Sequence, residues 1–335
     1  MKIVMIGEAA NHQEKLSASL AQPCDVVCLP PEAAGSSSFD AEIDGADVVV
    51  SLRYRRQGTA PRFALLHVPG AGLDGIDLAS LPPGCTVCNV FEHEVPIAEF
   101  VLLAMLQWQI RLDEMRVRFT PETWSEAYRH RVPHGELLGQ TLGLIGFGRI
   151  GRTIAARAKA FGMRVLAMDP VAVDATGLTE AILPPNQLER LLRESDFVAV
   201  TCPLTGSTRG LLDARTLDQM KRSAVLINVS RAEIADEAAL YEALKQGTIA
   251  GAFLDVWYAY PAAADETIRP SRFPFHRLPQ VYATPHSCAW TTALPYRRYA
   301  VIAENIRRWA TGEPLMNLVH RVPDSPDAKL RDRLQ

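Results

Sequence analysis

The sequence predicts an α/β protein of two domains, each built around a parallel sheet. Three observations lead to this prediction. At 335 residues, the chain is longer than one ordinary hydrophobic core supports. Its 48% hydrophobic and 22% charged residues are typical of a globular protein. Apolar, strand-like runs also alternate with helical stretches along most of the sequence, as in parallel sheets that are covered by helices.

The pattern of residues 1–94 predicts that they form the smaller of the two sheets. Five short apolar runs are separated by helical or turn-forming stretches. The first run ends at Gly7 and Glu8, which is too soon for the apolar region of a signal peptide, so a first strand is the better interpretation. Glycines in residues 69–77 permit a tight turn before the last run. The predicted strands are residues 2–7, 24–30, 46–51, 63–68 and 85–90.

Residues 95–289 predict a second domain with a larger parallel sheet. A long, largely apolar helix over residues 95–115 begins this region. Strands then alternate with helices such as residues 152–161 and residues 237–247. The predicted strands are residues 141–146, 163–169, 196–202, 224–230, 251–256 and 280–285.

A final helix over residues 292–310 stops before Gly312 and Pro314. Because this helix and the helix over residues 95–115 flank the second region, we infer that they bridge the two domains. The second domain is then inserted into the first. The expected boundaries are 1–94 and 290–322 for the first domain, 95–289 for the second, and 323–335 for a polar tail.

The composition excludes several classes of function. A net charge of −3 provides no basic field for nucleic acid or an anionic membrane. No uninterrupted apolar stretch approaches the ~20 residues that span a bilayer, so we expect a cytoplasmic protein. Cys85 and Cys88 stand three apart in a predicted strand and so point to opposite faces, and no second pair or histidine cluster completes a site. We therefore expect no metal.

A glycine motif predicts a dinucleotide site. Gly146, Gly148 and Gly151 are spaced as G-x-G-x-x-G, directly after a predicted strand and at the start of a helix. Small residues there let the backbone approach a pyrophosphate, whose charge is stabilised by the helix N-terminus. Asp169, at the end of the next strand, is placed to bind a ribose 2′-hydroxyl and would repel a 2′-phosphate. With Pro170 rather than a basic residue after it, NAD is favoured over NADP.

Reactive side chains end the later predicted strands. Ligands of open α/β sheets bind outside the carboxyl ends of the strands. An Arg, an Asp and a His at three successive strand ends therefore predict one site beside the dinucleotide. The residues at these ends are Cys202-Pro203, Ser230-Arg231, Asp255 and Thr284-Pro285-His286.

Several longer motifs complete the pattern. They are "HVPGAGLDGIDL", "ELLGQTLGLIGFGRIGR", "TCPLTGSTRGLLD", "LINVSRAEIADEAAL", "GAFLDVW" and "ATPHSCAW". With these motifs the sequence resembles the D-isomer-specific 2-hydroxyacid dehydrogenases over nearly its whole length. The resemblance implies a Rossmann, doubly wound parallel-sheet domain for NAD, inserted into a smaller flavodoxin-like α/β domain for the substrate. The implied reaction is hydride transfer between NAD and a small 2-hydroxy or 2-keto acid.

The resemblance also implies the roles of individual residues. Arg231 would bind the carboxylate and oxo group, and His286 would be the acid/base. These roles suit the two side chains. A guanidinium group is planar and can donate two parallel hydrogen bonds to a carboxylate and a carbonyl oxygen, and an imidazole can gain or lose a proton near neutral pH. Backbone amides at Ala71 and Gly72 would bind the substrate carboxylate. The implied cofactor contacts are Gly146, Gly148, Arg149, Ile150, Gly151, Asp169, Cys202, Pro203, Thr208, Val229 and Asp255, the last of these at the nicotinamide end.

The sequence departs from the family pattern at three places. Tyr260 stands where the family has a Glu hydrogen-bonded to the catalytic His, and Ala232 stands where Gly is usual. The stretch containing Arg53, Arg55 and Arg56 is unusually compact. Arg53 either lies at the substrate mouth, where it could select a second anionic group, or belongs with the other two to a solvated loop.

The Tyr260 departure has a consequence for His286. A neutral hydroxyl can orient the ring but adds no charge, so the His286 pKa should lie near ~6.5, or lower if the ring is buried. The alternative is that Tyr260 only packs with Trp257 and Tyr258. Carboxylates that could replace the missing Glu are Glu92, Glu94, Asp265 and Glu266.

Two other functions stay open from the sequence. One is dehydrogenation of another small anion, as in the formate and phosphite dehydrogenases of the same architecture. The other is a catalytically silent protein that senses NAD(H), which the retained Arg231 and His286 argue against. The expected partners are a small anionic substrate and a second copy of the chain, because the helix over residues 95–115 carries more apolar surface than a solvent-facing bridge would.

Overall fold

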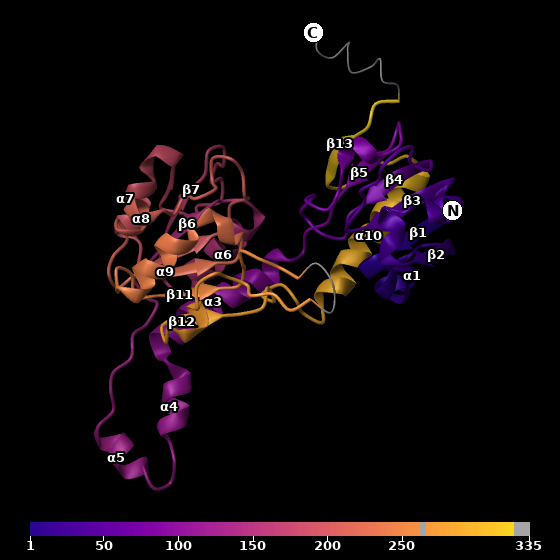
Figure 1. The fold of residues 1–335 in the computed structure, drawn as a ribbon. Helices are drawn as coiled ribbons and strands as arrows, with labels where there is room; N and C mark the ends of the chain where they lie inside the picture. The colour runs from indigo at the N-terminus through magenta and orange to yellow at the C-terminus, as the bar shows by residue number, and fades with distance from the viewer. Residues whose placement is uncertain (262–265, 325–335) are drawn as a thin grey trace. The chain divides into compact units, whose positions relative to one another are not determined.

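The computed structural model describes residues 1–261 and 266–324. The chain divides into two compact units (Figure 1). Unit 1 comprises Met1–Glu92 and Thr292–Gln335, and unit 2 comprises His93–Thr291. Each unit has its own sheet and its own hydrophobic cores.

Unit 1 contains a six-stranded sheet in the order β13-β5-β4-β3-β1-β2. All neighbours pair in parallel except β13, which pairs antiparallel with β5 at the edge. The five strands expected from the sequence are therefore present, and β13 is an addition. The strands are β1 (Lys2–Ile6), β2 (Asp25–Leu29), β3 (Ala46–Ser51), β4 (Phe63–His67), β5 (Thr86–Cys88) and β13 (Leu318–Arg321).

Alternation along the strands divides the apolar side chains of unit 1 between two cores. Val4 packs in one core, whereas the neighbouring Ile3 and Met5 pack in the other. Cys85 and Cys88 follow the same rule and lie in different cores, so they face away from each other. The helices of unit 1 are α1 (Gln13–Ser19), α2 (Asp40–Ile43) and α10 (Leu294–Thr311), the last of which ends at Gly312 in the left-handed conformation.

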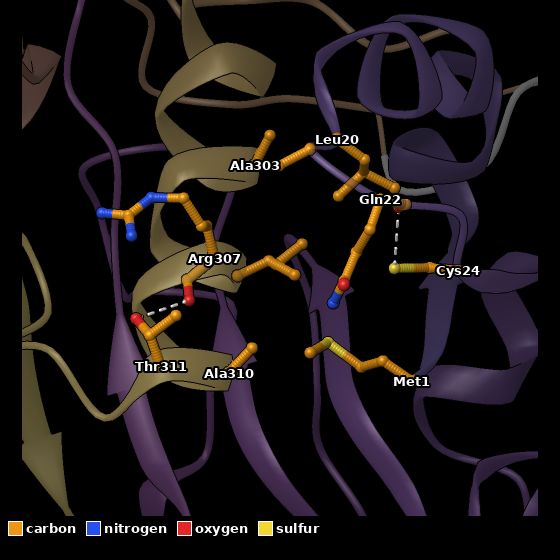
Figure 2. A pocket seen from close by; sticks show the side chains of 10 residues that line it. Met1, Leu20, Gln22, Cys24, Ala303, Arg307, Ala310 and Thr311 are labelled. Atoms are coloured by element: carbon orange, nitrogen blue, oxygen red, sulfur yellow. Dashed lines mark hydrogen bonds between the residues drawn. The ribbon is translucent and has the colours of Figure 1, made fainter.

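A small cavity of about 120 Å³ lies where the end of α1 meets α10 (Figure 2). Met1, Leu20 and Ala303 contribute to its mainly apolar lining. The Arg307 guanidinium is turned away from Gln22, because it pairs with Glu304 and Glu313 on its own side (Figure 2). The cavity is thus a packing gap between two helices, and no unpaired charge of the described residues is directed into it.

Unit 2 contains a seven-stranded parallel sheet in the order β12-β11-β10-β9-β6-β7-β8. The strand order reverses between β6 and β9, which is the switch point where ligands of doubly wound sheets bind. Strand β8 was not expected from the sequence. The strands are β6 (Thr141–Ile145), β7 (Arg164–Met168), β8 (Ala181–Leu183), β9 (Phe197–Val200), β10 (Val225–Asn228), β11 (Gly251–Leu254) and β12 (Val281–Ala283).

Helices on both faces of this sheet complete unit 2 and confirm the predicted doubly wound α/β class (Figure 1). One core includes residues of α3 and α6, and the other includes residues of α7, α8 and α9. The helices are α3 (Glu94–Ile110), α4 (Leu112–Arg118), α5 (Trp124–Arg129), α6 (Arg149–Ala160), α7 (Leu188–Glu194), α8 (Ala214–Leu217) and α9 (Glu237–Lys245).

The helix predicted over residues 95–115 is wrong at its C-terminal end. Helix α3 stops at Ile110 because Arg111 adopts a left-handed conformation with φ 57°, and α4 begins after it. Helices α4 and α5 then extend away from the sheet as an arm (Figure 1). The Gly135 amide closes the base of the arm by donating to the Gln109 carbonyl at 3.0 Å. We call residues 111–134 the arm.

The longest helices of the described chain are α3 and α10, of 17 and 18 residues. No helix of this part of the chain is by itself both long and apolar enough to cross a bilayer. Only α3 and α4 taken together meet the length and composition, and a bend of 48° separates them.

Candidate active site

The glycine loop between β6 and α6 has the form of a pyrophosphate cradle. Gly146 has φ 104° and lies so close to Cys202 that an added Cβ would be 2.6 Å from its amide nitrogen. Gly148 caps α6, and an added Cβ there would meet nothing within 4 Å. The first amides of a helix have no intrahelical acceptor, so this open end of α6 fits an anion.

The Asp169 carboxylate organises the same loop. Its Oδ2 accepts the Phe147 amide at 2.9 Å, and its Oδ1 accepts the amides of Val171 and Ala172 at 3.0 and 2.9 Å. Although burial raises the Asp169 pKa, these amides hold it below its usual range. A carboxylate has about four acceptor positions, so one position on Oδ2 remains for a ribose hydroxyl.

Arg231 stands just beyond the carboxyl end of β10. The side chain of Asn228 fixes the turn, because it accepts the Ser230 amide at 3.1 Å and donates to the Arg231 carbonyl at 3.0 Å. Arg231 is partly buried, and its Nη1 donates to the Ser230 carbonyl at 2.9 Å. Ala232 is not among the residues with positive φ, so the alanine fits this backbone without strain.

Asp255 is fully buried at the end of β11, and its charge is used by the turn that carries His286. The carboxylate accepts the Thr284 hydroxyl at 2.6 Å, the Ser287 amide at 2.8 Å and the Cys288 amide at 3.0 Å. His286 has φ 56°, which is unfavourable for a residue with a Cβ. Asp255 therefore holds a strained backbone on both sides of His286, and strain of this kind clusters at functional sites.

The Tyr260 hydroxyl lies 2.8 Å from His286 Nδ1. The same hydroxyl accepts the Trp257 amide at 3.0 Å, so its position is fixed independently of the histidine. Of the two interpretations made from the sequence, this contact favours orientation of the ring. Unlike a carboxylate, a hydroxyl can accept from Nδ1–H or donate to a bare Nδ1. Tyr260 can therefore support both protonation states of the ring.

Local charges set the titration of this pair. Burial lowers the His286 pKa, the Asp255 carboxylate raises it and the Arg231 guanidinium lowers it, with a net lowering. Burial raises the Tyr260 pKa, so its hydroxyl is neutral at pH 7. A lowered histidine pKa is expected for a ring without a carboxylate at Nδ1.

Two of the carboxylates considered as replacements for the missing Glu have an arginine as their neighbour. Glu92 is in unit 1 and pairs with Arg297 at 3.4 Å, and Glu94 lies 3.9 Å from Arg149. Glu266 is exposed. Asp265 lies outside the described residues. Within the described chain, Asp255 is the carboxylate that acts on His286.

The other sequence-predicted residues fall into two groups. In unit 2, Cys202 and Val229 are buried beside the strand ends, and the Thr208 hydroxyl holds its own turn by donating to the Pro203 carbonyl at 2.7 Å. Arg149, Ile150 and Gly151 form the first turn of α6. The predicted substrate contacts Arg53, Ala71 and Gly72 belong to unit 1.

The three arginines of unit 1 that stand close together in the sequence, Arg53, Arg55 and Arg56, have different surroundings in the structure. Arg56 is buried, pairs with Asp40 and donates to the Ser36 carbonyl at 2.8 Å, so the solvated-loop interpretation is wrong for this residue. Arg55 donates to the Asp74 carbonyl. Arg53 is exposed and is the member of the cluster that stays a candidate for substrate selection.

Two functional contacts were missed from the sequence. One is the set of bonds from Asp255 to Thr284, Ser287 and Cys288, and the other is the Trp257 amide that holds Tyr260. Three of these four bonds have a backbone amide as the donor, and the fourth comes from the Thr284 hydroxyl. Backbone donors have no side-chain pattern in the sequence, and Asp255 lies about thirty residues from its partners.

Comparison with known proteins gives the following similarities. Residues 102–288 match the family model described as "D-isomer specific 2-hydroxyacid dehydrogenase, NAD binding domain". A glyoxylate reductase of Korarchaeum cryptofilum is 34% identical over 271 residues, which cover 78% of this chain and 77% of that protein. A D-3-phosphoglycerate dehydrogenase of Methanocaldococcus jannaschii is 32% identical over 300 residues, or 86% of this chain, which spans only 54% of that protein's length.

The fold is shared with a solved structure. The NAD-complexed D-isomer specific 2-hydroxyacid dehydrogenase of Lactobacillus delbrueckii ssp. bulgaricus superposes with a TM-score of 0.75 at 24% identity. The match covers 96% of this chain and 100% of that one. It supports the two-sheet α/β architecture described above.

Proposed function

The chain belongs to the D-isomer specific 2-hydroxyacid dehydrogenase family, and we propose that it interconverts a small 2-keto acid and its 2-hydroxy acid with NAD(H). The observation that carries this proposal is the set of strand-end residues in unit 2. Arg231, Asp255 and His286 follow three adjacent strands, and a neutral hydroxyl holds the imidazole. A cation, an oriented acid/base and a dinucleotide cradle are the parts that hydride transfer to a keto acid requires.

The cofactor residues fit NAD. In our proposal Gly146, Gly148 and the first turn of α6 bind the pyrophosphate, and the remaining acceptor position of Asp169 takes the ribose hydroxyl. The bound cofactor supplies the hydride to C2 of the keto acid. Cys202 and Val229, which are buried just beyond the ends of β9 and β10, are proposed as further cofactor contacts.

The protein's own residues bind and protonate the substrate. Arg231 holds the carboxylate and carbonyl oxygen of the keto acid as a planar fork. His286, protonated on both nitrogens, donates from Nε2 to the carbonyl oxygen while Nδ1–H donates to the Tyr260 oxygen. The overall change is keto acid + NADH + H⁺ → hydroxy acid + NAD⁺. Loss of the Nε2 proton leaves a neutral ring that keeps Nδ1–H, and this N–H still donates to the Tyr260 oxygen.

Unit 1 is proposed to contribute substrate contacts. The amides of Ala71 and Gly72 belong to the glycine-rich turn after β4, and Asn89 supports the turn by donating to the Ala71 carbonyl at 2.8 Å. Arg53 is the proposed selector for a second anionic group. These assignments rest on the family resemblance and on the exposure of Arg53.

We also propose a homodimer. Most of the apolar residues of α3 pack inside unit 2 against α6, but Leu103 is 61% exposed. The arm adds large exposed apolar side chains, among them Val117 at 80% and Trp124 at 50%. Apolar side chains gathered on a protruding segment mark an interface rather than a solvent-facing surface. A two-fold partner would bury this surface.

A kinetic screen tests the proposed reaction. NADH consumption is measured with glyoxylate, hydroxypyruvate, pyruvate and bulkier keto acids, in wild type and in Arg231→Ala and Arg231→Lys. We expect turnover with at least one keto acid, none in the Ala variant, and about 1% or less in the Lys variant, because a point charge cannot replace the fork. NADH affinity should change little in either variant.

The outcomes separate the alternatives. Near-normal kcat/KM in the Lys variant would exclude Arg231 as the carboxylate clamp. Tight NADH binding without turnover of any keto acid would favour the NAD(H)-sensing protein. Turnover of formate or phosphite instead would favour the dehydrogenase of another small anion.

A further inference from the structure

Unit 2 contains a cavity of about 590 Å³ that the proposed reaction does not use. It lies between Trp257 and the segment of residues 269–277, with Ala283 of β12 at its edge. Its volume is within the ~300–1,000 Å³ of small-molecule sites. None of the residues assigned above to NAD or to catalysis lines it.

The wall formed by residues 269–277 is anchored to the rest of unit 2. The Ser271 hydroxyl and the Arg272 amide both donate to Oε1 of the buried Glu237 at 2.8 Å. The Pro270 carbonyl accepts the Tyr258 amide at 3.1 Å. These bonds hold the segment against α9 and against the chain after β11. The segment is therefore a fixed wall of the cavity rather than a loose surface loop.

Two aromatic rings with fixed orientations line the cavity. The Trp257 indole donates from Nε1 to the Thr284 carbonyl at 2.9 Å. Phe273 stacks on Tyr241 with ring centroids 5.0 Å apart. Aromatic rings held in this way offer a flat apolar surface to a ligand at little cost in conformational entropy.

The charged side chains that line the cavity in the described chain are all arginines. Arg269, Arg272, His276 and Arg277 line it, and no acidic side chain does so within the described chain. Glu237 lies behind the wall and neutralises Arg272. Arg269 and Arg277 are exposed, and neither has a side-chain hydrogen bond or ion pair among the described residues. Two arginines that pair with no acid of the described chain therefore border an aromatic cavity.

We propose that this cavity is a second ligand site, for a small organic anion that joins a phosphate or carboxylate to a flat apolar body. The Arg269 and Arg277 guanidinium groups bind the anionic group, for which their planar donors are suited. Trp257 and Phe273 contact the flat part. Trp257 also donates its amide to Tyr260, so one residue belongs to the wall of this site and to the support of the catalytic pair.

The test is a calorimetric titration of the full-length protein, saturated with NADH, with phenyl phosphate. Benzoate is the carboxylate counterpart, and inorganic phosphate is the anion without a flat body. We expect sub-millimolar binding of at least one aromatic anion, which identifies the anionic group, and at least tenfold weaker binding of inorganic phosphate. The double variant Arg269→Ser/Arg277→Ser should weaken binding at least tenfold.

Arg62→Ser is the matched control, because Arg62 is an exposed arginine of unit 1. NADH affinity and thermal melting show that each variant is folded. The proposal is overturned if neither aromatic anion binds at millimolar concentration, if the double variant binds as wild type does, or if Arg62→Ser weakens binding as strongly. None of these results depends on turnover, so they leave the proposed dehydrogenase reaction untouched.

Discussion

Tyr260 and His286 form a pair in which a neutral hydroxyl occupies the place of a carboxylate. Their 2.8 Å contact orients the ring, and the Trp257 amide fixes the hydroxyl. Without a negative charge at Nδ1, burial and Arg231 keep the His286 pKa low despite Asp255. The pair therefore has orientation without the electrostatic support that a glutamate would supply to the imidazolium.

The pH dependence of keto-acid reduction follows from this pair. Reduction requires the protonated ring, so kcat/KM should fall tenfold per pH unit above the His286 pKa, which burial holds below the usual value for histidine. Oxidation requires the neutral ring and should persist to lower pH. Tyr260→Glu adds a charge next to the imidazolium and should shift the reduction limb up by about one pH unit or more.

The test is to measure kcat/KM for reduction and for oxidation from pH 5 to 9 in wild type, Tyr260→Glu and Tyr260→Phe. The limb of each profile is the pH range over which kcat/KM falls. The Phe variant is the matched control, because it removes the hydrogen bond without adding charge, and its limb should not rise. A wild-type limb already above pH 8, with no upward shift in the Glu variant, would show that the charge argument is wrong.

Asp169 carries the prediction on cofactor choice. A 2′-phosphate beside this carboxylate is repelled, so kcat/KM should favour NADH over NADPH by about 100-fold. Asp169→Asn should reduce that preference at least tenfold, because an amide no longer repels phosphate. Asp174→Asn is a suitable control, since Asp174 is in the following loop and also caps that loop through Thr176 and Thr179. Equal kcat/KM for the two cofactors in wild type would contradict the assignment.

The reactive side chains could be identified from the sequence, but the hydrogen bonds that hold them in place could not. The spacing of Gly146, Gly148, Gly151 and Asp169 matched a known geometry, and the structure places these residues together. The clamp made by Asp255 depends on backbone amides, which have no signature in the sequence. Arg56 was misjudged for a related reason, because its burial results from carbonyls of the turn at residues 33–36.

Among the secondary-structure elements, the predicted central strands are all present and the errors lie at the edges. The runs that form β1, β3, β6 and β10 are apolar because both faces of these strands are covered. Edge strands β8 and β13 are short and partly exposed, so neither shows such a run. Helix α3 was overextended because apolar residues continue past Arg111, whereas a left-handed residue ends the helix there.

The exposed apolar side chains of the arm lead us to predict a homodimer in solution. Light scattering at micromolar concentration should give twice the chain mass, because a partner would cover the apolar arm. Val117→Glu/Trp124→Glu places charges in this surface and should give a monomer. Tyr296→Glu, at an equally exposed aromatic residue of unit 1, should leave the mass unchanged. A monomeric wild type would contradict the dimer.

For the whole molecule, the class of architecture was predictable and the substrate was not. Alternation of strands and helices, together with a single dinucleotide motif after β6, indicated two parallel sheets and placed the cofactor on the second. The proposed substrate contacts come from loops such as those of Arg53 and Ala71, and the sequence does not reveal the conformations of such loops. The cationic cavity beside Trp257 was missed for the same reason.

In the proposed reaction, a hydride is transferred to C2 of a 2-keto acid bound at unit 2, and His286 supplies the proton. The most direct measurement uses NADH deuterated at the transferred position, with the best keto acid from the screen, followed by mass spectrometry and chiral analysis of the product. We expect one deuterium at C2 of the D-hydroxy acid, and no product from Arg231→Ala. Deuterium that remains in the nicotinamide, or a hydroxy acid without deuterium at C2, would contradict the account.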